Sequence, residues 1–251
     1  KMLGRYLINS GSNSPDIMCF QEMSESFLKF LYHDNEKIKL MYPYIHEKDF
    51  TQDSLANRNA HIENSNPKDI ETFLISKHQP KHIKVIGLGG SLHYTNSLQI
   101  IEFDNLVIMN CYLQAGSKAS PGQKMKWYHY SRCRTQQFMY IKKLMEEPEY
   151  KNKAIIILGD FNFDLNGKET EWPELIQLKQ LNLNDSWKDF NPSDNESVIE
   201  KGLTENTKLN TMRYNNKFED KMYRYDAILY SGDKLKVLLS ETIGSQPLKL
   251  D

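Results

Sequence analysis

Apolar residues gather in short runs along the chain, and their spacing predicts its secondary structure. The run Ala154-Ile155-Ile156-Ile157-Leu158 does not alternate with polar residues and stops at Gly159, which predicts a strand buried on both faces. Other apolar runs predict further strands, at residues 17–20, 73–76, 85–88, 98–103, 106–113, 224–230 and 236–239. Apolar residues at helical spacing predict helices, at residues 2–8, 27–31, 130–145 and 173–180. The polar stretches 32–70 and 189–220 predict irregular chain.

The order of these elements indicates the fold class. Many strands with few helices between them predict an α/β protein in which stacked sheets are covered by helices, rather than one doubly wound sheet. No Gly/Ser run, Pro-rich stretch, long charge block or internal repeat marks a linker, so we expect residues 1–251 to form a single domain. A domain of this length buries a substantial core.

Composition narrows the class of protein. The net charge is −1, so no overall basic charge marks a nucleic-acid binder, and any polyanion must meet a local patch. The three cysteines have no metal-ligand spacing and favour a reducing compartment. No apolar stretch reaches membrane-spanning length and no signal peptide is visible, so we expect an intracellular protein without a membrane span. We take a monomer as the expectation.

Polar residues stand where several predicted strands end. Asp160 and Asn162 follow the run 154–158, and alternation along an extended chain would point both to one side. Glu22 ends the strand at 17–20, and Asp226 lies at the edge of the strand at 224–230. Each has an ordinary alternative: a turn, a solvated strand end, or an ion pair with a neighbouring Arg. If the acids converge, two carboxylates and an amide suit a hard ion such as Mg²⁺, with Mn²⁺ as a substitute.

Four short motifs now resemble a known family. In order along the chain they are Phe20-Gln21-Glu22, Asn110-Cys111-Tyr112-Leu113, Gly159-Asp160-Phe161-Asn162 and Arg224-Tyr225-Asp226-Ala227-Ile228-Leu229. The set resembles the motifs of the endonuclease/exonuclease/phosphatase superfamily, the DNase I-like Mg²⁺-dependent phosphoesterases, from about Pro15 to the C-terminus. The resemblance implies a four-layer α/β sandwich, with two packed, mainly antiparallel sheets flanked by helices.

The resemblance also implies roles for the strand-end residues. Glu22 matches the carboxylate that binds the catalytic Mg²⁺, and Asp160 matches the acid that orients or deprotonates the attacking water. Asn162 matches the amide that holds the scissile phosphate, and Asp226 matches the acid that fixes the tautomer of a catalytic histidine. Such a site suits phosphodiester hydrolysis, because a metal ion neutralises the anionic phosphate while an acid positions water for in-line attack.

The predicted strand at 106–113 supplies two more candidates. Tyr112 stands where members of the family carry a His or Tyr near the phosphate, so the resemblance implies a catalytic role. Asn110 lies two residues earlier and would face the same way, which makes it a weaker, substrate-binding candidate.

Two motifs of the family have no counterpart in the sequence. A first strand with an Asn ligand should precede Glu22, and a Ser-Asp-His motif should follow Asp226. No histidine follows His129. The sequence is then either a fragment that lacks its first and last strands or a degenerate, inactive relative. We favour the fragment, because decay would not spare the internal acids.

A basic and aromatic segment indicates the substrate. Residues 105–145 contain no Asp or Glu but several Lys and Arg, with Trp127, Tyr128 and Tyr130 among them. Basic residues that contact phosphates and aromatic rings that stack on bases are typical of single-stranded nucleic-acid binding, so Lys126 and Arg132 are substrate-binding candidates. The alternative is a solvated loop and the exposed face of a helix.

Three functions remain open from the sequence. The first is a Mg²⁺-dependent phosphodiesterase for nucleic acid, either a nuclease or a DNA-end-processing enzyme of DNA repair; Arg224-Tyr225-Asp226 and residues 183–187 are similar to 5′-tyrosyl-DNA phosphodiesterases. The second is a phospholipid or inositol-phosphate phosphoesterase, since Tyr112-Leu113-Gln114-Ala115 resembles neutral sphingomyelinases. The third is a non-catalytic scaffold. The basic-aromatic segment favours the first.

Overall fold

The computed structural model describes residues 14–23, 27, 29–46, 72–89, 96–116, 124–192, 202–206 and 222–242, with backbone only for residues 46 and 124–127. Contacts group the chain into two compact units, residues 1–113 and residues 114–251, and each is described here by itself. The expectation of a single domain stays a prediction. The predicted helix at 2–8 lies outside the described residues.

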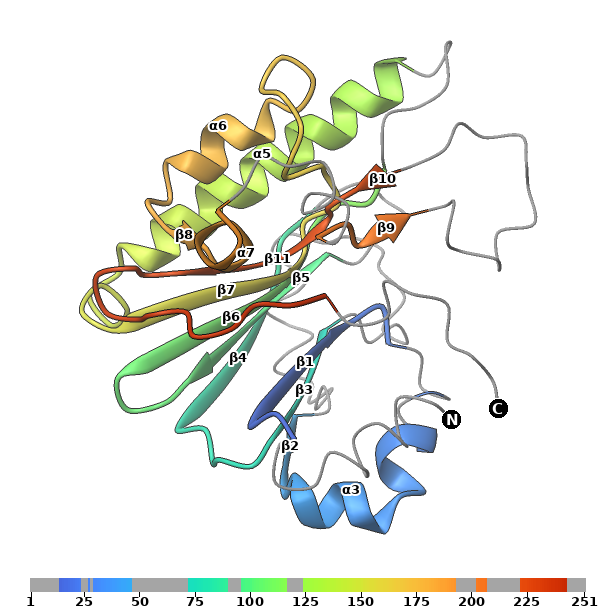
Figure 1. Cartoon of the computed structure of the whole chain (residues 1–251), viewed down its shortest axis with the longest axis vertical. Helices are drawn as coiled ribbons and strands as arrows, with labels where there is room; N and C mark the ends of the chain where they lie inside the picture. The colour runs from blue at the N-terminus through green and yellow to red at the C-terminus, as the bar shows by residue number, and fades with distance from the viewer. Residues whose placement is uncertain are drawn as a thin grey trace. The chain divides into compact units, whose positions relative to one another are not determined.

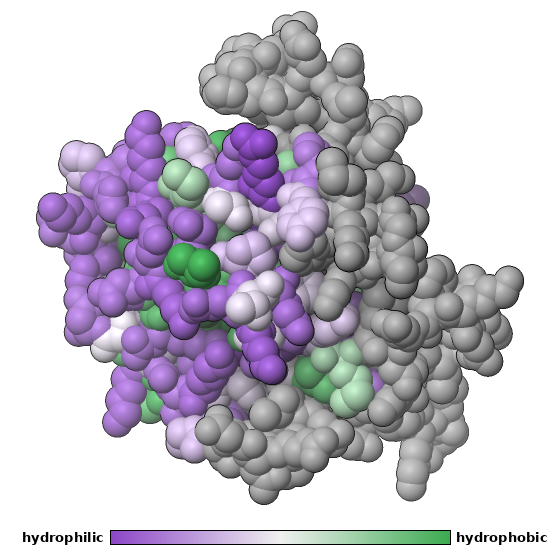
Figure 2. Space-filling model, turned by 90° about the horizontal axis from the view of Figure 1, so that it is seen from above, coloured by the Kyte–Doolittle hydropathy of each residue, from purple (hydrophilic) through white to green (hydrophobic). Residues whose placement is uncertain are grey.

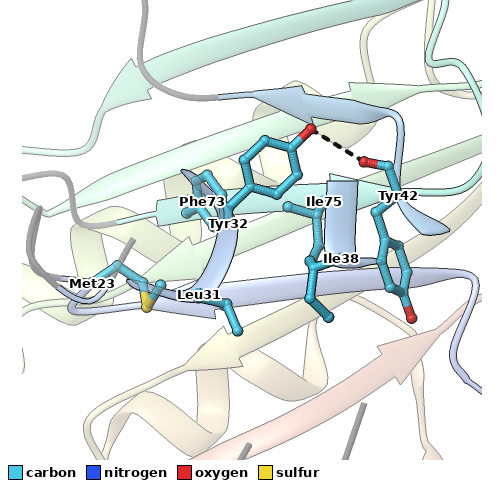
Figure 3. Packing of buried hydrophobic residues seen from close by; sticks show 7 residues of the cluster. All are labelled: Met23, Leu31, Tyr32, Ile38, Tyr42, Phe73 and Ile75. Carbon is cyan, nitrogen blue, oxygen red and sulfur yellow. Dashed lines mark hydrogen bonds between the residues drawn. The ribbon is translucent and has the colours of Figure 1, made fainter. Parts of the chain in front are cut away.

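The first unit contains a small antiparallel sheet next to the candidate residue Glu22. Its strands lie in the order β1 (Ile17–Gln21), β3 (Thr72–Ser76) and β2 (Tyr44–His46). The π-helical turn η2 (Lys29–His33) and the helix α3 (Glu36–Met41) contribute Leu31, Tyr32 and Ile38 to a hydrophobic cluster with Phe73 and Ile75 of β3 (Figure 3). This cluster fixes the strand that leads into Glu22.

Three elements of this part of the chain, η2, α3 and β2, differ from expectation. The helix predicted at 27–31 is the short turn η2, and both α3 and β2 lie inside the stretch predicted to be irregular. The helix α3 is short, with Ile38 as its buried residue and Leu40 82% exposed, so its apolar residues do not follow a helical period. Asn35 caps it, because the Asn35 side chain accepts a hydrogen bond from the Ile38 amide at 3.2 Å.

A second antiparallel sheet of the first unit contains β4 (His82–Gly87), β5 (Ser97–Glu102) and β6 (Leu106–Tyr112) in that order. Its strands β5 and β6 contact β3 and β1 of the small sheet. Between the sheets the hydroxyls of Thr72 and Ser97 lie 3.1 Å apart. The facing sheets are the stacked arrangement that the sequence predicted.

The second unit contains a sheet in the order β7 (Ala154–Asp160), β11 (Asp226–Tyr230) and β8 (Asn184–Asp185), all antiparallel. The long helix α5 (Lys124–Met145) and the helix α6 (Glu174–Lys179) lie on one side of these strands (Figure 1). The ring of Phe138 from α5 stacks on that of Phe161 at 5.8 Å. The remaining elements are α7 (Ser186–Phe190) and the strand pair β9 (Glu205–Asn206) and β10 (Met222–Tyr223).

One strand prediction in this unit is wrong. Residues 236–239 are irregular chain with a bend at Leu238, and Leu238 and Leu239 are 82% and 64% exposed. Their apolar run resembles a strand, but a strand also needs a neighbouring strand for its backbone hydrogen bonds. The helix α5, by contrast, begins at Lys124 rather than at residue 130, because the Lys-rich first turns carry little apolar signal.

Viewed from above, the described surface is mainly hydrophilic, with scattered hydrophobic residues (Figure 2). Exposed apolar residues on α5 and α6 include Met139, Tyr140 and Ile176. Scattered residues of this kind are normal for a protein surface. None of the helices in the described ranges is long and apolar enough to cross a membrane.

Candidate active site

Glu22 stands directly after β1 in a backbone conformation that few glutamates adopt. Its φ is +53°, in the left-handed region, and its side chain is exposed. The Glu22 carboxylate accepts a hydrogen bond from the hydroxyl of Tyr112, which is only 3% exposed at the end of β6. The structure therefore joins two predicted site residues from sequence positions far apart. The Tyr112 hydroxyl orients the Glu22 carboxylate.

Asn110 is buried between the two sheets of the first unit. Its side chain is 0% exposed and its Oδ1 accepts a hydrogen bond from Gln21 Nε2 at 2.6 Å. Its Nδ2 donates to Gln99 Oε1 at 3.1 Å and to the Phe20 and Phe73 carbonyls at 3.3 Å. A carboxamide with these partners has no group left for a substrate. The geometry therefore gives Asn110 a structural role in place of the predicted substrate contact.

In the second unit Asp160 and Asp226 lie opposite each other in the β7–β11 ladder. Opposed residues of an antiparallel pair share one face of the sheet, so both carboxylates lie at the same strand end. Asp160 is half-buried and Asp226 is exposed. The sequence predicted that strand-end acids converge, and the second unit brings these two together.

Asn162 reaches this site by a turn. The strand ends at Asp160, and Asn162 has a φ of +56°, so the extended alternation used to place both side chains on one side is wrong. Instead, the backbone N–H of Asn162 donates a hydrogen bond to Asp160 Oδ1 at 2.8 Å. This is the turn that the sequence left as an alternative. It places the backbone of Asn162 against the Asp160 carboxylate while Phe161 between the two residues is buried.

Backbone hydrogen bonds tie the two motifs of the second unit together. The Phe161 amide donates to the Tyr225 carbonyl at 2.9 Å, which continues the ladder past Asp160. The Thr204 hydroxyl accepts from the Tyr225 amide at 2.9 Å and from the Asp226 amide at 3.1 Å. Sequence reasoning missed Thr204, since it lies in a polar stretch without apolar periodicity.

Arg224, two residues before Asp226, is held by a different acid. Its guanidinium forms a two-pronged ion pair with Asp185, with one contact of 3.0 Å between NH1 and Oδ1. Burial raises the pKa of Asp185, but the hydrogen bonds and charge of Arg224 outweigh it and hold the pKa below its ordinary value. The nearby Asp164 is also buried, and burial raises its pKa. Arg224 is thus paired with Asp185.

The basic-aromatic segment divides into exposed and buried parts. Tyr128 is 61% exposed and Arg132, one helical turn further along α5, is also exposed. The side chain of Lys126 lies outside the described residues. Arg134, part of the same basic run, is 0% exposed and forms an ion pair with the buried Glu174 at 2.8 Å. It belongs to the apolar face of α5, four residues before Phe138, and cannot contact phosphates.

Arg134 also explains how the chain leaves β6. Its NH1 donates to the carbonyls of Gln114 at 2.9 Å and of Gly116 at 3.0 Å. Gly116 has a φ of +125°, and a side chain there would overlap the ring of Tyr130. The Gln114 amide adds a bond to Gln137 Oε1 at 3.0 Å. The helix α5 therefore fixes the segment 114–116.

The predicted Mg²⁺ site depends on which side chains can offer oxygen ligands. Within the described ranges, no group of three or more His, Cys, Asp and Glu side chains is arranged to hold a metal ion. Glu22 nevertheless offers one exposed carboxylate, which Tyr112 orients. Mg²⁺ keeps several waters and takes one or two protein carboxylates, so this donor fits Mg²⁺ better than Zn²⁺.

A pocket on the second unit lies apart from these groups. Residues 235–241 line it together with Ile156, Ile228 and Tyr230. The lining is largely apolar and contains none of the predicted site residues.

Comparisons with known proteins give a family and a fold. The Endonuclease/Exonuclease/phosphatase family matches residues 2–247. The crystal structure of TDP2 from C. elegans is similar, with a TM-score of 0.60 and 17% identity over 92% of this chain. TDP2 from D. rerio complexed with single strand DNA product has a TM-score of 0.56 and 16% identity over 90% of this chain and 75% of that one. No curated protein matches the sequence.

The likeness shows the fold and confirms the predicted α/β sandwich. The chain spans 58% of the length of the C. elegans protein.

Proposed function

Because the chain belongs to the endonuclease/exonuclease/phosphatase family, as its motifs predicted, we propose that it is a Mg²⁺-dependent phosphodiester hydrolase that acts on nucleic acid. The observation that carries this proposal is the strand end where Asp160 lies opposite Asp226 and adjoins Asn162. Two acids and an amide at one strand end supply the general base and the hydrogen-bond donor that such a reaction needs.

Each residue has a chemical task in the proposed reaction. Asp160 orients the attacking water and accepts its proton, since a carboxylate at a half-buried strand end is a suitable general base. The Asn162 carboxamide donates a hydrogen bond to a phosphate oxygen, and its backbone turn fixes the donor beside the base. When bound at Glu22, Mg²⁺ supplies charge neutralisation of the phosphate and of the leaving group.

Two further predicted site residues are assigned no proton transfer. Tyr112 positions Glu22 through its hydroxyl. Asp226 matches an acid that orients a histidine in this family, but no histidine follows His129 in the sequence. We therefore assign no proton transfer to Asp226 in this chain.

Nucleic acid is the proposed substrate for two reasons. Tyr128 and Arg132 form an exposed pair, aromatic and basic, on α5. In addition, a structure of the same fold, TDP2 from D. rerio, is complexed with single strand DNA product. We extend this proposal to an intracellular location and a role in DNA-end processing.

A side-by-side assay tests the proposal. The protein is incubated with single-stranded DNA, the same DNA carrying a 5′-phosphotyrosine, single-stranded RNA and sphingomyelin vesicles, each with Mg²⁺ or with EDTA. We expect Mg²⁺-dependent cleavage of a nucleic-acid substrate that Asp160→Asn removes. Hydrolysis of the lipid alone would contradict the nucleic-acid substrate. Inactivity on all substrates, together with no stabilisation by Mg²⁺, would favour a non-catalytic scaffold.

A further inference from the structure

A row of buried amides connects the interior of the first unit to the strand end at Glu22. Gln99 on β5 lies directly opposite Asn110 on β6, and both side chains are 0% exposed. Asn110 in turn bonds Gln21, the residue before Glu22, at 2.6 Å and the carbonyl of Phe20 at 3.3 Å. The row thus crosses from one sheet to the other and ends next to the proposed Mg²⁺ ligand.

Gln99 sets the orientation of the Asn110 side chain together with the carbonyls of Phe20 and Phe73. A carboxamide presents an acceptor on one side and a donor on the other. Gln99 Oε1 only accepts, so the Asn110 Nδ2 must face it, at 3.1 Å. This leaves Asn110 Oδ1 to accept from Gln21 Nε2. With Asn110 reversed, its oxygen would face Gln99 Oε1 and the two backbone carbonyls, and each of these acceptors would lose its donor.

The consequence for Glu22 follows from its backbone. A non-glycine residue at a φ of +53° is under backbone strain and keeps that conformation only when its surroundings hold it. Asn110 holds both residues before Glu22, through the Phe20 carbonyl and the Gln21 side chain. Tyr112, on the same strand and face as Asn110, then holds the carboxylate itself.

We propose that Gln99 is a positioning residue of the active site, which acts through Asn110 and Gln21 to aim the Glu22 carboxylate. Gln99 touches neither substrate nor metal. The effect of Gln99 on catalysis rests on the proposed function. Its effect on the position of the Glu22 carboxylate can be tested without any activity.

The geometric test follows the hydrogen bond between Tyr112 and Glu22 by NMR of protein labelled with ¹³C at the tyrosine Cζ. The Tyr112 signal is the one missing from Tyr112→Phe, and the shift that reports loss of its partner is the one seen in Glu22→Gln. We expect Gln99→Met, which keeps the size of the side chain but removes its acceptor, to shift the Tyr112 signal in the same direction. A Tyr112 signal at the wild-type position in Gln99→Met would overturn the proposal.

Two further variants separate positioning from general loss of packing. Ile101→Val removes a buried methylene from the same strand without touching the amide row, and should leave the Tyr112 signal in place. Gln99→Glu keeps the oxygen that accepts from Asn110, so we expect it to restore the wild-type signal even if it lowers the melting temperature. If Gln99→Met does not fold, Gln21→Met breaks the row at its partly exposed end and gives the same readout.

Activity measurements test whether Gln99 contributes to catalysis. In Gln99→Met we expect kcat and the affinity for Mg²⁺, measured by calorimetry, to fall by about tenfold to a hundredfold with KM for DNA unchanged. An equal fall in Ile101→Val would overturn the catalytic part. If the wild type hydrolyses no nucleic acid, the proposed function fails while the NMR comparison still decides whether Gln99 positions Glu22.

Discussion

Asp160 and Asp226 lie directly opposite each other on the paired strands β7 and β11, with their side chains on one face. Two carboxylates in such a position repel each other, so the arrangement costs stability. Proteins keep such pairs where chemistry needs them. Removing one charge of the pair should therefore raise the stability of the protein and lower its activity.

Asp226→Asn should stabilise the protein, because it removes the repulsion at the cross-strand pair. We expect a gain of about 0.2–1 kcal/mol in the free energy of unfolding, measured by urea denaturation at low salt without Mg²⁺. Asp160→Asn should abolish hydrolysis, whereas Asp226→Asn should cost less activity. Asp233→Asn, in an exposed turn, serves as the control. A loss of stability in Asp226→Asn would contradict the repulsion.

Replacing Asn162 with glycine separates its backbone from its side chain. Glycine adopts a φ of +56° without strain, so Asn162→Gly should keep the melting temperature while it loses the carboxamide and most of the activity. Asn182→Gly is the matched control, because Asn182 has a φ of +53° and lies on the surface. Activity equal to wild type in Asn162→Gly would show that the carboxamide takes no part in the reaction.

Removal of the Glu22 carboxylate should remove stabilisation by Mg²⁺. A ligand at a hundred times its dissociation constant stabilises the folded state by about 2.7 kcal/mol, which raises the melting temperature. We expect Mg²⁺ to raise the melting temperature of the wild type and of Glu36→Gln, an exposed control on α3, but not that of Glu22→Gln. Equal stabilisation of all three proteins would place the Mg²⁺ site elsewhere.

Two arginines of α5 should respond differently to the same substitution. Arg134→Met leaves the buried Glu174 without its partner and should cost about 3–5 kcal/mol of stability. Arg132→Met should leave the melting temperature unchanged and weaken DNA binding, with the slope of log K against log salt smaller by about 1. Fluorescence anisotropy over a salt series measures the slope. Unchanged DNA affinity in Arg132→Met would remove this residue from the proposed binding surface.

The ion pair of Arg224 and Asp185 predicts a pH dependence. Its partner holds the pKa of Asp185 below the ordinary value of 3.8, so the carboxylate stabilises the fold above that value and this contribution is lost as the pH falls through the folded-state pKa. We expect Asp185→Asn to lower the melting temperature at pH 7 and the difference from wild type to shrink in acid. A difference that stays constant from pH 7 to acid would exclude this linkage.

The contribution of Asp164 to stability should change with pH in the opposite direction to that of Asp185. Burial raises its pKa, so protonation relieves the cost of a buried charge and its contribution favours the folded state more at low pH. Asp164 accepts hydrogen bonds from the amides of Arg224 and Asn166, both at 3.1 Å, and Asp164→Asn keeps an acceptor for them. Its effect on stability should therefore be smaller than that of Asp185→Asn at pH 7.

The sequence by itself determined the main strands and the candidate acids. Continuous apolar runs located β1, β3, β5, β6, β7 and β11 to within a few residues. The prediction that residues 154–158 are buried on both faces is wrong, because alternate residues of β7 are only half-buried. The same runs show where polar residues interrupt them, which singled out Glu22, Asp160 and Asp226. These features are local, so periodicity along the chain is enough to find them.

Only the tertiary structure decided which polar residues meet. Local pattern did not separate Arg132 from Arg134, because the difference lies in Glu174, forty residues further along the chain. It also left Asn110 as a substrate ligand, although Gln99 and Gln21 occupy its amide. Asp160 and Asn162 are joined by a turn rather than by alternation, since the strand ends between them. Hydrogen-bond partners of buried groups come from distant segments, so the spacing of residues along one segment does not predict them.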